Sequence, residues 1–168
     1  IIKRKMDLDH IIKYEDVIYS LYFHVANNAP FNTFLLTKNH FRSMKLELGE
    51  NFKFYGYFDG ERLIGFNTLI KNKHSLETYF LGYDSDTQRE KMLYLNMLYD
   101  MVSYAIKKHF KTIVFARTAL EIKSSVGAIP VDMYGFLRHR NPLLQGKMES
   151  LFKYFEPKVD WKHRNPFK

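Results

Sequence analysis

The sequence predicts a three-layer α/β/α domain of the α+β class, with a mixed, mainly antiparallel sheet flanked by helices. A strong hairpin signal, Asp59-Gly60, joins two apolar and aromatic runs at residues 52–58 and 62–70. A third run of this kind, over residues 75–83, follows at once and extends the antiparallel meander. A long helical pattern and another β-like run come next, and this β-α-β order adds a parallel pair to the sheet.

Two helices are expected before the hairpin. Residues 10–26 carry apolar side chains at roughly helical spacing, and Asn27-Asn28-Ala29-Pro30 ends that pattern. A second helix is expected from about 37 to 48, with Thr37 as N-cap and Gly49 as C-cap.

The second half of the chain alternates helices and strands. The long helix is expected to begin at Asp86 or Thr87 as N-cap and to end near residue 108. The further expected elements are a strand at 111–116, a short helix, a strand at 131–138 and a helix from Asn141-Pro142 to about 154. We therefore expect one domain over residues 1–155 and a polar tail over 156–168.

Composition narrows the class of protein. The 168 residues include no cysteine, which excludes disulfides, thiol nucleophiles and cysteine-based zinc sites and fits a cytoplasmic location. No two of the seven histidines have the i, i+4 spacing of a zinc motif, so no metal site is expected. No apolar run approaches the roughly 20 residues that span a bilayer. Because the chain begins with Ile, it is expected to be part of something longer.

The net charge of +8 is unevenly distributed. Residues 1–84 carry 11 Lys and Arg against 10 Asp and Glu, whereas residues 85–168 carry 15 against 8. A positive field over the second half would attract an anionic ligand, either a phosphorylated cofactor or a nucleic acid. A solvated basic surface explains the same charge.

A cluster of charges and hydroxyls follows the expected strand at 111–116. Residues 115–128 read Phe-Ala-Arg-Thr-Ala-Leu-Glu-Ile-Lys-Ser-Ser-Val-Gly-Ala. Ligands in α/β proteins collect beyond the carboxyl ends of strands, so this segment is a candidate site. A helix capped by Thr118, with Glu121 completing a capping box and Gly127 near the C-cap, is the alternative interpretation.

The order of elements resembles the GNAT acyltransferase fold. More narrowly, the chain resembles acyltransferase-like domains of a bacterial group related to the Fem peptidoglycan-bridge aminoacyl transferases. This narrower resemblance lies in Tyr79-Phe-Leu-Gly-Tyr-Asp84, Leu93-Tyr-Leu-Asn96 and above all residues 117–128. It covers most of residues 10–155.

The resemblance implies transfer of an acyl group from acyl-coenzyme A, in the first place acetyl-CoA, to an amine or hydroxyl. In GNAT proteins two strands separate around the pantetheine, and the start of the long helix binds the pyrophosphate. The residues implied in cofactor binding are Tyr79, Phe80, Leu81 and Gly82 beside the thioester, and Ser85, Asp86, Thr87, Gln88 and Arg89 beside the pyrophosphate.

The phosphate loop departs from the family pattern. That pattern is Gln/Arg-x-x-Gly-x-Gly/Ala, whereas residues 84–91 contain no glycine and bring in Asp84 and Asp86, which repel a pyrophosphate. Fem-type relatives also lack the loop and use aminoacyl-tRNA. A tRNA-dependent aminoacyl transferase, and a degenerate non-catalytic domain that binds a ligand, are therefore alternatives.

Acyl transfer needs a base, donors for the oxyanion and an acid for the thiolate. Glu77 and Glu121 are candidate bases. The alternative for Glu77 is an outward-facing position on its strand, and the alternatives for Glu121 are a capping box or an ion pair. Tyr134 is the candidate acid, although a role in the core also explains it. The candidate acceptor-binding residues are Arg117, Thr118, Lys123 and Ser124. The acceptor is expected to be a small molecule or a cell-envelope precursor.

Overall fold

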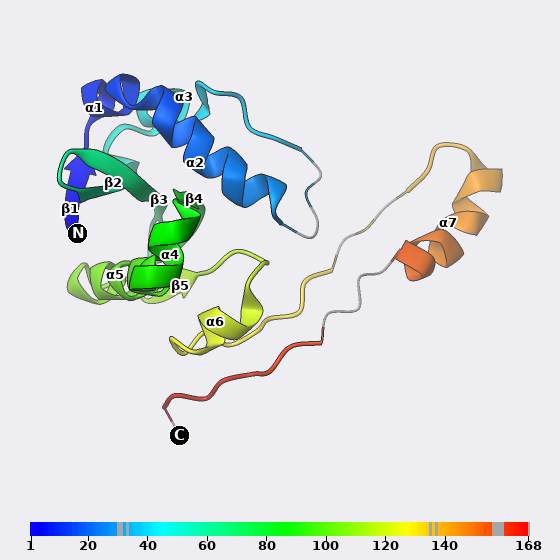
Figure 1. Cartoon of the computed structure of the whole chain (residues 1–168). Helices are drawn as coiled ribbons and strands as arrows, with labels where there is room; N and C mark the ends of the chain where they lie inside the picture. Colours follow the sequence, from blue (N-terminus) through cyan, green and yellow to red (C-terminus); the bar gives the residue numbers. More distant parts are fainter. Residues whose placement is uncertain (30–31, 33, 135, 137, 156–159, 168) are drawn as a thin grey trace. The chain divides into compact units, whose positions relative to one another are not determined.

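The computed structural model describes residues 1–29, 32, 34–134, 136, 138–155 and 160–167. Its chain forms two compact units, Ile1–Thr118 and Ala119–Lys168 (Figure 1). The single domain proposed over residues 1–155 remains a prediction. In chain order the first unit contains β1 (Ile2–Met6), α1 (Leu8–Lys13), α2 (Glu15–Asn27), α3 (His40–Leu48), the 3₁₀ turn η1 (Gly49–Asn51), β2 (Phe52–Asp59), β3 (Arg62–Asn72), β4 (Ser75–Tyr83), α4 (Ser85–Lys91), α5 (Leu93–Lys107) and β5 (Thr112–Val114).

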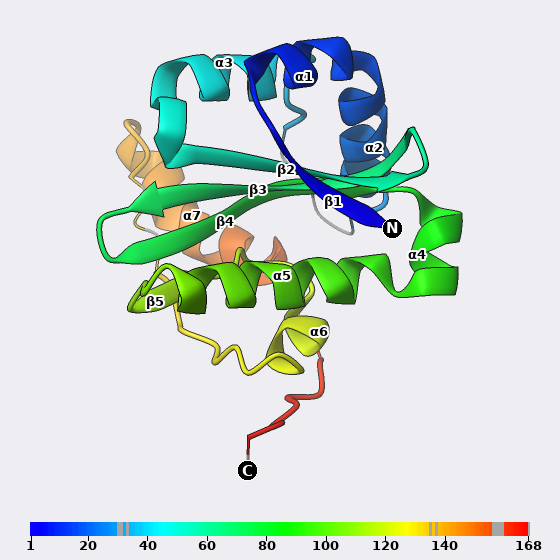
Figure 2. The ribbon, with the colours of Figure 1, turned by 90° about the vertical axis from the view of Figure 1, so that its left-hand side faces the viewer.

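The first unit has three layers around a mixed sheet. The strands lie in the order β1-β2-β3-β4-β5. Every neighbouring pair is antiparallel except β4 and β5, which are parallel. Figure 2 shows α1, α2 and α3 on one face of the sheet and α5 on the other. This arrangement confirms the expected α+β fold class with a mainly antiparallel sheet.

The hairpin forms as the sequence predicts. Gly60 has a φ of 58°, in the left-handed region that a residue without a Cβ enters at little cost. Beyond β3, the third meander strand has the expected bounds, Ser75–Tyr83. Among the strands of the described residues, β1, which pairs with β2 at the outer edge of the sheet, is the one that was not predicted.

The first two expected helices differ in their details. The pattern over residues 10–26 is interrupted at Tyr14 (φ −102°, ψ 13°), so it forms the separate helices α1 and α2. The expected N-cap, Thr37, lies before the helix; its Oγ1 donates to Asn39 Oδ1 at 2.8 Å, and α3 begins at His40. Gly49 ends α3 as predicted, with a φ of 51°.

The long helix after β4 is also two helices. Asp84, rather than Asp86 or Thr87, is the N-cap of α4. Met92 then adopts the left-handed conformation (φ 50°, ψ 42°), which separates α4 from α5. Local hydrophobic spacing continues across Met92, and therefore it could not reveal this break.

The core beneath α1, α2 and α3 is rich in aromatic rings. Phe41 of α3 lies edge to face with Phe54 and Phe66, at ring-centroid distances of 5.8 and 5.1 Å. These three side chains are at most 2% exposed. On the opposite face of the sheet, α5 buries Met97 and Leu98. Both helix layers are thus fixed to the sheet by buried apolar area.

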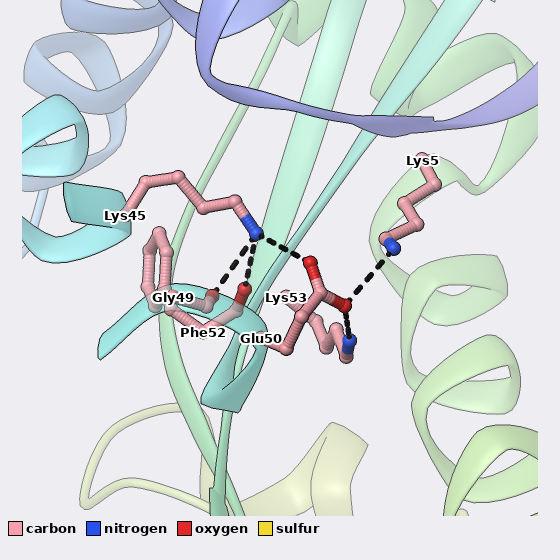
Figure 3. A network of polar contacts seen from close by, with 6 residues as sticks. All are labelled: Lys5, Lys45, Gly49, Glu50, Phe52 and Lys53. Carbon is pink, nitrogen blue, oxygen red and sulfur yellow. Dashed lines mark hydrogen bonds and ion pairs between the residues drawn. The ribbon is translucent and has the colours of Figure 1, made fainter. Parts of the chain in front are cut away.

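One carboxylate links three elements at the edge of the first unit. Glu50 accepts hydrogen bonds from Lys53 of β2 at 2.6 Å, Lys5 of β1 at 3.2 Å and Lys45 of α3 at 3.3 Å (Figure 3). These bonds, the one from Lys53 foremost, lower the pKa of Glu50 to about 2. Lys45 is only 8% exposed, and it also donates to two backbone carbonyls.

Among its described residues, the second unit contains the helices α6 (Leu120–Ser124) and α7 (Pro142–Phe155). The expected helix after Asn141-Pro142 is thus confirmed. The strand predicted over residues 131–138 is wrong for its described part, 131–134, 136 and 138, which forms no strand. Of the expected tail, residues 156–159 and 168 lie outside the described part of the chain.

Candidate functional site

The two parallel strands of the sheet separate after a short pairing. Their register joins Ser75 to Thr112, Leu76 to Ile113 and Glu77 to Val114, and β5 ends there. β4 continues for six more residues to Tyr83. Just beyond the paired residues, Thr78 Oγ1 donates to the carbonyl of Val114 at 3.1 Å. Beyond this point the β5 side of β4 has no strand partner in the described part of the chain.

A bulge lies in β4 where the strands separate. Leu69 of β3 pairs with Thr78 and Asn67 pairs with Leu81, so Tyr79 and Phe80 together face the single residue Thr68. The Thr68 hydroxyl donates to the Phe80 carbonyl at 2.5 Å, which satisfies a group that the bulge removes from the ladder. Because the bulge places two residues opposite one, the rings of Tyr79 and Phe80 lie against each other, with centroids 4.6 Å apart.

His40, the first residue of α3, contacts both bulge residues. Its Nε2 lies 3.0 Å from the Tyr79 hydroxyl, and the two rings stack with centroids 5.8 Å apart and planes 28° from parallel. The imidazole also lies edge to face with Phe80 and Phe41. Burial lowers the pKa of His40 and raises that of Tyr79. Both groups are therefore neutral near pH 7.

Sequence reasoning placed Tyr79 near the thioester but missed His40. The two residues are 39 positions apart, and nothing in the spacing of the histidines distinguishes this one. In the sequence, the one local indication that His40 is a functional residue is its position directly after residues 28–39, which connect α2 to α3.

Gly82 of β4 has a structural reason to be glycine. A Cβ at this position would lie 2.6 Å from two backbone atoms of α2, Leu21 C and Tyr22 N. The helix therefore approaches the strand closely beside the separation of β4 and β5. Leu81, the residue before it, is half-buried and pairs with Asn67 of β3.

The residues expected near a pyrophosphate are held by internal bonds at the start of α4. Asp84 accepts from the Thr87 backbone N–H and hydroxyl, both at 2.9 Å, and from Arg62 Nη2 at 2.9 Å. The bond from the Thr87 N–H is the main cause that lowers the pKa of Asp84. Ser85 bonds to Nε2 of His24. A carboxylate already occupies the first turn of this helix, which disfavours an anion there.

The start of α5 is closer to the GNAT phosphate-loop pattern than the start of α4 is. Arg89-Glu-Lys-Met-Leu-Tyr94 has the spacing of Arg-x-x-Gly-x-Gly. Met92 stands at the position of the first glycine and has the left-handed backbone conformation that favours glycine. However, Gln88 Oε1 accepts the Tyr94 N–H at 2.5 Å. This helix terminus therefore carries its own side-chain cap. Arg89 and Asp86 are exposed.

Glu77 lies at the last pair of the parallel ladder, opposite Val114. It is half-buried, and its Oε1 accepts from the Ser75 hydroxyl at 3.2 Å. Because side chains two apart in a strand share a face, Glu77 and Tyr79 face the same side of the sheet. The candidate base therefore lies beside the bulge.

In the second unit, Glu121 forms an ion pair instead of a capping box. Arg164 Nη2 and Nε donate to Glu121 Oε1 at 2.5 and 3.0 Å. The Arg164 N–H donates to Ser124 Oγ at 2.9 Å. Ala119 (φ 55°), rather than Thr118, precedes α6 and provides no side-chain cap. The alternative of an ion pair is thus the observed one.

The other candidates from the charged segment differ in exposure. Lys123 is 7% exposed, and burial lowers its pKa to about 8. Arg117 and Thr118, at the end of the first unit, are exposed. Tyr134 is 83% exposed, so the core role considered for it is not observed. Its role as an acid is untested.

The described residues contain no group of three or more His, Asp or Glu side chains that could hold a metal ion. Among them, no helix is both long and apolar enough to cross a membrane.

Comparison with known proteins gives the fold its name. Neither a protein-family model nor a curated protein matches the sequence. Among solved structures, a predicted acetyltransferase from Clostridium acetobutylicum with acetyl-CoA is similar at a TM-score of 0.62 and 13% identity, covering 83% of this chain and 99% of that one. An aminoglycoside acetyltransferase from an uncultured soil metagenomic sample, in complex with sisomicin, gives 0.55 and 14%, covering 82% and 96%. A GNAT family acetyltransferase from Staphylococcus aureus gives 0.56 and 12%, covering 82% and 97%. None of these similarities supports the narrower Fem-type group. The strand order, the separation of β4 from β5 and these similarities together show that the chain has the fold of the GNAT acetyltransferases.

Proposed function

We propose that this chain is an acyltransferase that moves an acyl group, in the first place acetyl, from acyl-coenzyme A to an amine or hydroxyl acceptor. The observation that carries the proposal is the separation of β4 from β5 after three paired residues. It leaves a strand edge of the kind along which an extended, amide-containing chain can bind by backbone hydrogen bonds. The similar structure with acetyl-CoA supports the same donor.

The residues of the first unit fit the pantetheine part of this donor better than its pyrophosphate. The part of β4 that lacks a partner on its β5 side, from Tyr79 to Gly82, would hold the pantetheine chain and the thioester. Near the pyrophosphate, Arg89 and Lys91 offer positive charge, but Gln88 caps α5 and Asp84 caps α4. Donor binding there therefore requires that the Gln88 side chain leave the Tyr94 N–H.

A thermal-shift titration with acetyl-CoA tests the proposal. A ligand at a hundred times its Kd stabilises the folded state by about 2.7 kcal/mol. For a chain of this size that corresponds to a rise in Tm of about 8 °C. Desulfo-CoA should give a comparable rise, and adenine alone should not. An unchanged Tm at millimolar acetyl-CoA would refute the proposal.

The acceptor is proposed to be a small amine. The soil acetyltransferase in complex with sisomicin supports this size class. A cell-envelope precursor remains a further proposal, which rests only on the narrower sequence resemblance. Turnover with a panel of amines would distinguish these acceptors.

A non-catalytic ligand-binding domain is the second candidate. The two capped helix termini favour it, because they replace the open backbone N–H groups of a phosphate loop with internal bonds. Such a domain would turn over no acceptor, whether or not it binds acetyl-CoA.

A tRNA-dependent aminoacyl transferase rests on charge alone. Residues 85–168 carry 15 Lys and Arg against 8 Asp and Glu. Binding of tRNA should then weaken steeply as salt rises, and salt-independent or absent binding would exclude this candidate.

A further inference from the structure

The pair His40 and Tyr79 has the geometry of a proton-transfer pair. A donor and acceptor 3.0 Å apart are within hydrogen-bond distance, and stacking against Tyr79 holds the imidazole plane in place. Phe80 and Phe41 border the imidazole on its other sides. Tyr79 lies on the bulge of β4, two residues after the last residue pair that β4 makes with β5, and His40 contacts it from α3.

We propose that Tyr79 and His40 act as a relay that removes the proton from the acceptor amine during acyl transfer. This proposal rests on the acyltransferase function proposed above and names its base. Tyr79 would contact the reacting nitrogen, and His40 would act through Tyr79 as the residue that receives and holds the proton.

The step is balanced in atoms and electrons. The lone pair of the neutral amine forms a C–N bond with the acyl carbon, and the C–S bond breaks with its electron pair left on sulfur. The proton from nitrogen passes to Tyr79 Oη while the phenol proton passes to His40 Nε2. His40 then returns its proton through solvent to the thiolate, which restores the neutral pair.

The surroundings leave His40 free to accept this proton. Lys38, two residues before α3, forms an ion pair with Asp16 of α2, and Nε of Arg42 on α3 lies 3.6 Å from Oε1 of Glu15, also on α2. These cations are thus balanced by carboxylates.

Tyr22 of α2 and Glu77 of β4 are titratable groups on elements that pack together beside the pair. The Tyr22 hydroxyl accepts the Leu36 N–H at 3.0 Å, and Glu77 on the same strand as Tyr79 is bonded to Ser75. The pKa of His40, lowered by burial, keeps the imidazole unprotonated at neutral pH.

The first test measures the coupling of the pair without any substrate. In the proposed relay the Tyr79 hydroxyl donates to Nε2 of neutral His40, which favours the unprotonated imidazole, so Tyr79→Phe should raise the pKa of His40. Histidine resonances followed by NMR between pH 4 and 8 report this change. An unchanged His40 titration in the variant would show that the two groups are not coupled.

The second test measures turnover. Release of free CoA from acetyl-CoA is followed with a thiol reagent, which the protein does not consume because it has no cysteine. The acceptors are sisomicin, spermidine and lysine. His40→Asn and Tyr79→Phe should each lower kcat about 100-fold, and the fall in wild-type rate below the His40 pKa should disappear in His40→Asn. In His40→Asn, which lies outside the proposed donor-binding residues, acetyl-CoA affinity should stay within about twofold of wild type.

Two exposed residues provide matched controls. His74→Asn and Tyr99→Phe make the same chemical changes away from the bulge, and they should keep wild-type turnover. If both relay variants keep wild-type kcat and pH profile, the relay is wrong while the acyltransferase function stands. If acetyl-CoA binds without turnover of any amine, the relay has no reaction to serve and is contradicted. If acetyl-CoA does not bind, the proposed function itself fails.

Discussion

Replacing Gly82 with alanine should force β4 and α2 apart. The new Cβ would lie 2.6 Å from Leu21 C, from Tyr22 N and from an edge atom of the Phe66 ring. The first two atoms belong to the helix backbone, and therefore no side-chain rotation can relieve the overlap. Overpacking in a core costs about 1–3 kcal/mol, and the rigid neighbours here place Gly82→Ala at about 3 kcal/mol.

Urea unfolding followed by far-UV circular dichroism measures this cost. Far-UV dichroism suits the purpose because the single tryptophan, Trp161, lies in the second unit. A loss of about 3 kcal/mol corresponds to a fall in Tm of about 9 °C for a chain of this length.

Gly146→Ala is the matched control. A Cβ at Gly146 in α7 meets no heavy atom within 4 Å, and alanine favours a helix by up to about 1 kcal/mol. This variant should be as stable as wild type or more stable. If Gly82→Ala also unfolds within about 0.5 kcal/mol of wild type, α2 does not rest on β4 as described.

Three further substitutions test other parts of the structure. Glu50→Gln should lower Tm at pH 7. Because the pKa of Glu50 is lowered to about 2, the stabilisation from its carboxylate is lost as pH falls from 4.5 through 2. The Tm values of wild type and variant should therefore converge over that range of pH. Parallel curves, or equal Tm values at pH 7, would contradict that role. Gln88→Ala should destabilise the fold by about 1 kcal/mol through loss of the α5 cap, yet tighten acetyl-CoA binding in calorimetry by freeing the Tyr94 N–H; weaker binding would count against the capping interpretation. Phe41→Ala should cost about 3–5 kcal/mol in urea unfolding, and a cost below about 1 kcal/mol would be inconsistent with its burial.

The sheet could be predicted because its signals are local. Asp59-Gly60 determines the hairpin, and the apolar runs on either side determine β2 and β3. The helix breaks at Tyr14 and Met92 could not be predicted, since neither residue is a glycine or proline and the apolar spacing continues through both. Tertiary packing outweighs local preference at such positions.

The strand expected over residues 131–138 shows a different limit. Its apolar and aromatic residues favour a strand, but a strand also needs a neighbour for its backbone N–H and C=O groups. Sequence spacing does not show whether that neighbour exists.

The candidate site was predicted only in part. Tyr79 was assigned to the correct strand, and its position beside the separation of β4 and β5 follows from the resemblance in strand order. Its contact with His40 depends on how α3 packs on the sheet. Glu121 was identified as a charged residue of interest, but its partner Arg164 lies 43 positions away. Long-range pairs of this kind are set by packing, and local patterns carry no record of them.

Backbone NMR of the chain titrated with acetyl-CoA tests the central claim most directly. If the donor binds in the separation of β4 from β5, the largest amide shifts should fall on residues 79–83, and a second group on residues 92–95 at the start of α5. Shifts that leave residues 79–83 unchanged, or no shifts at millimolar acetyl-CoA, would contradict the account.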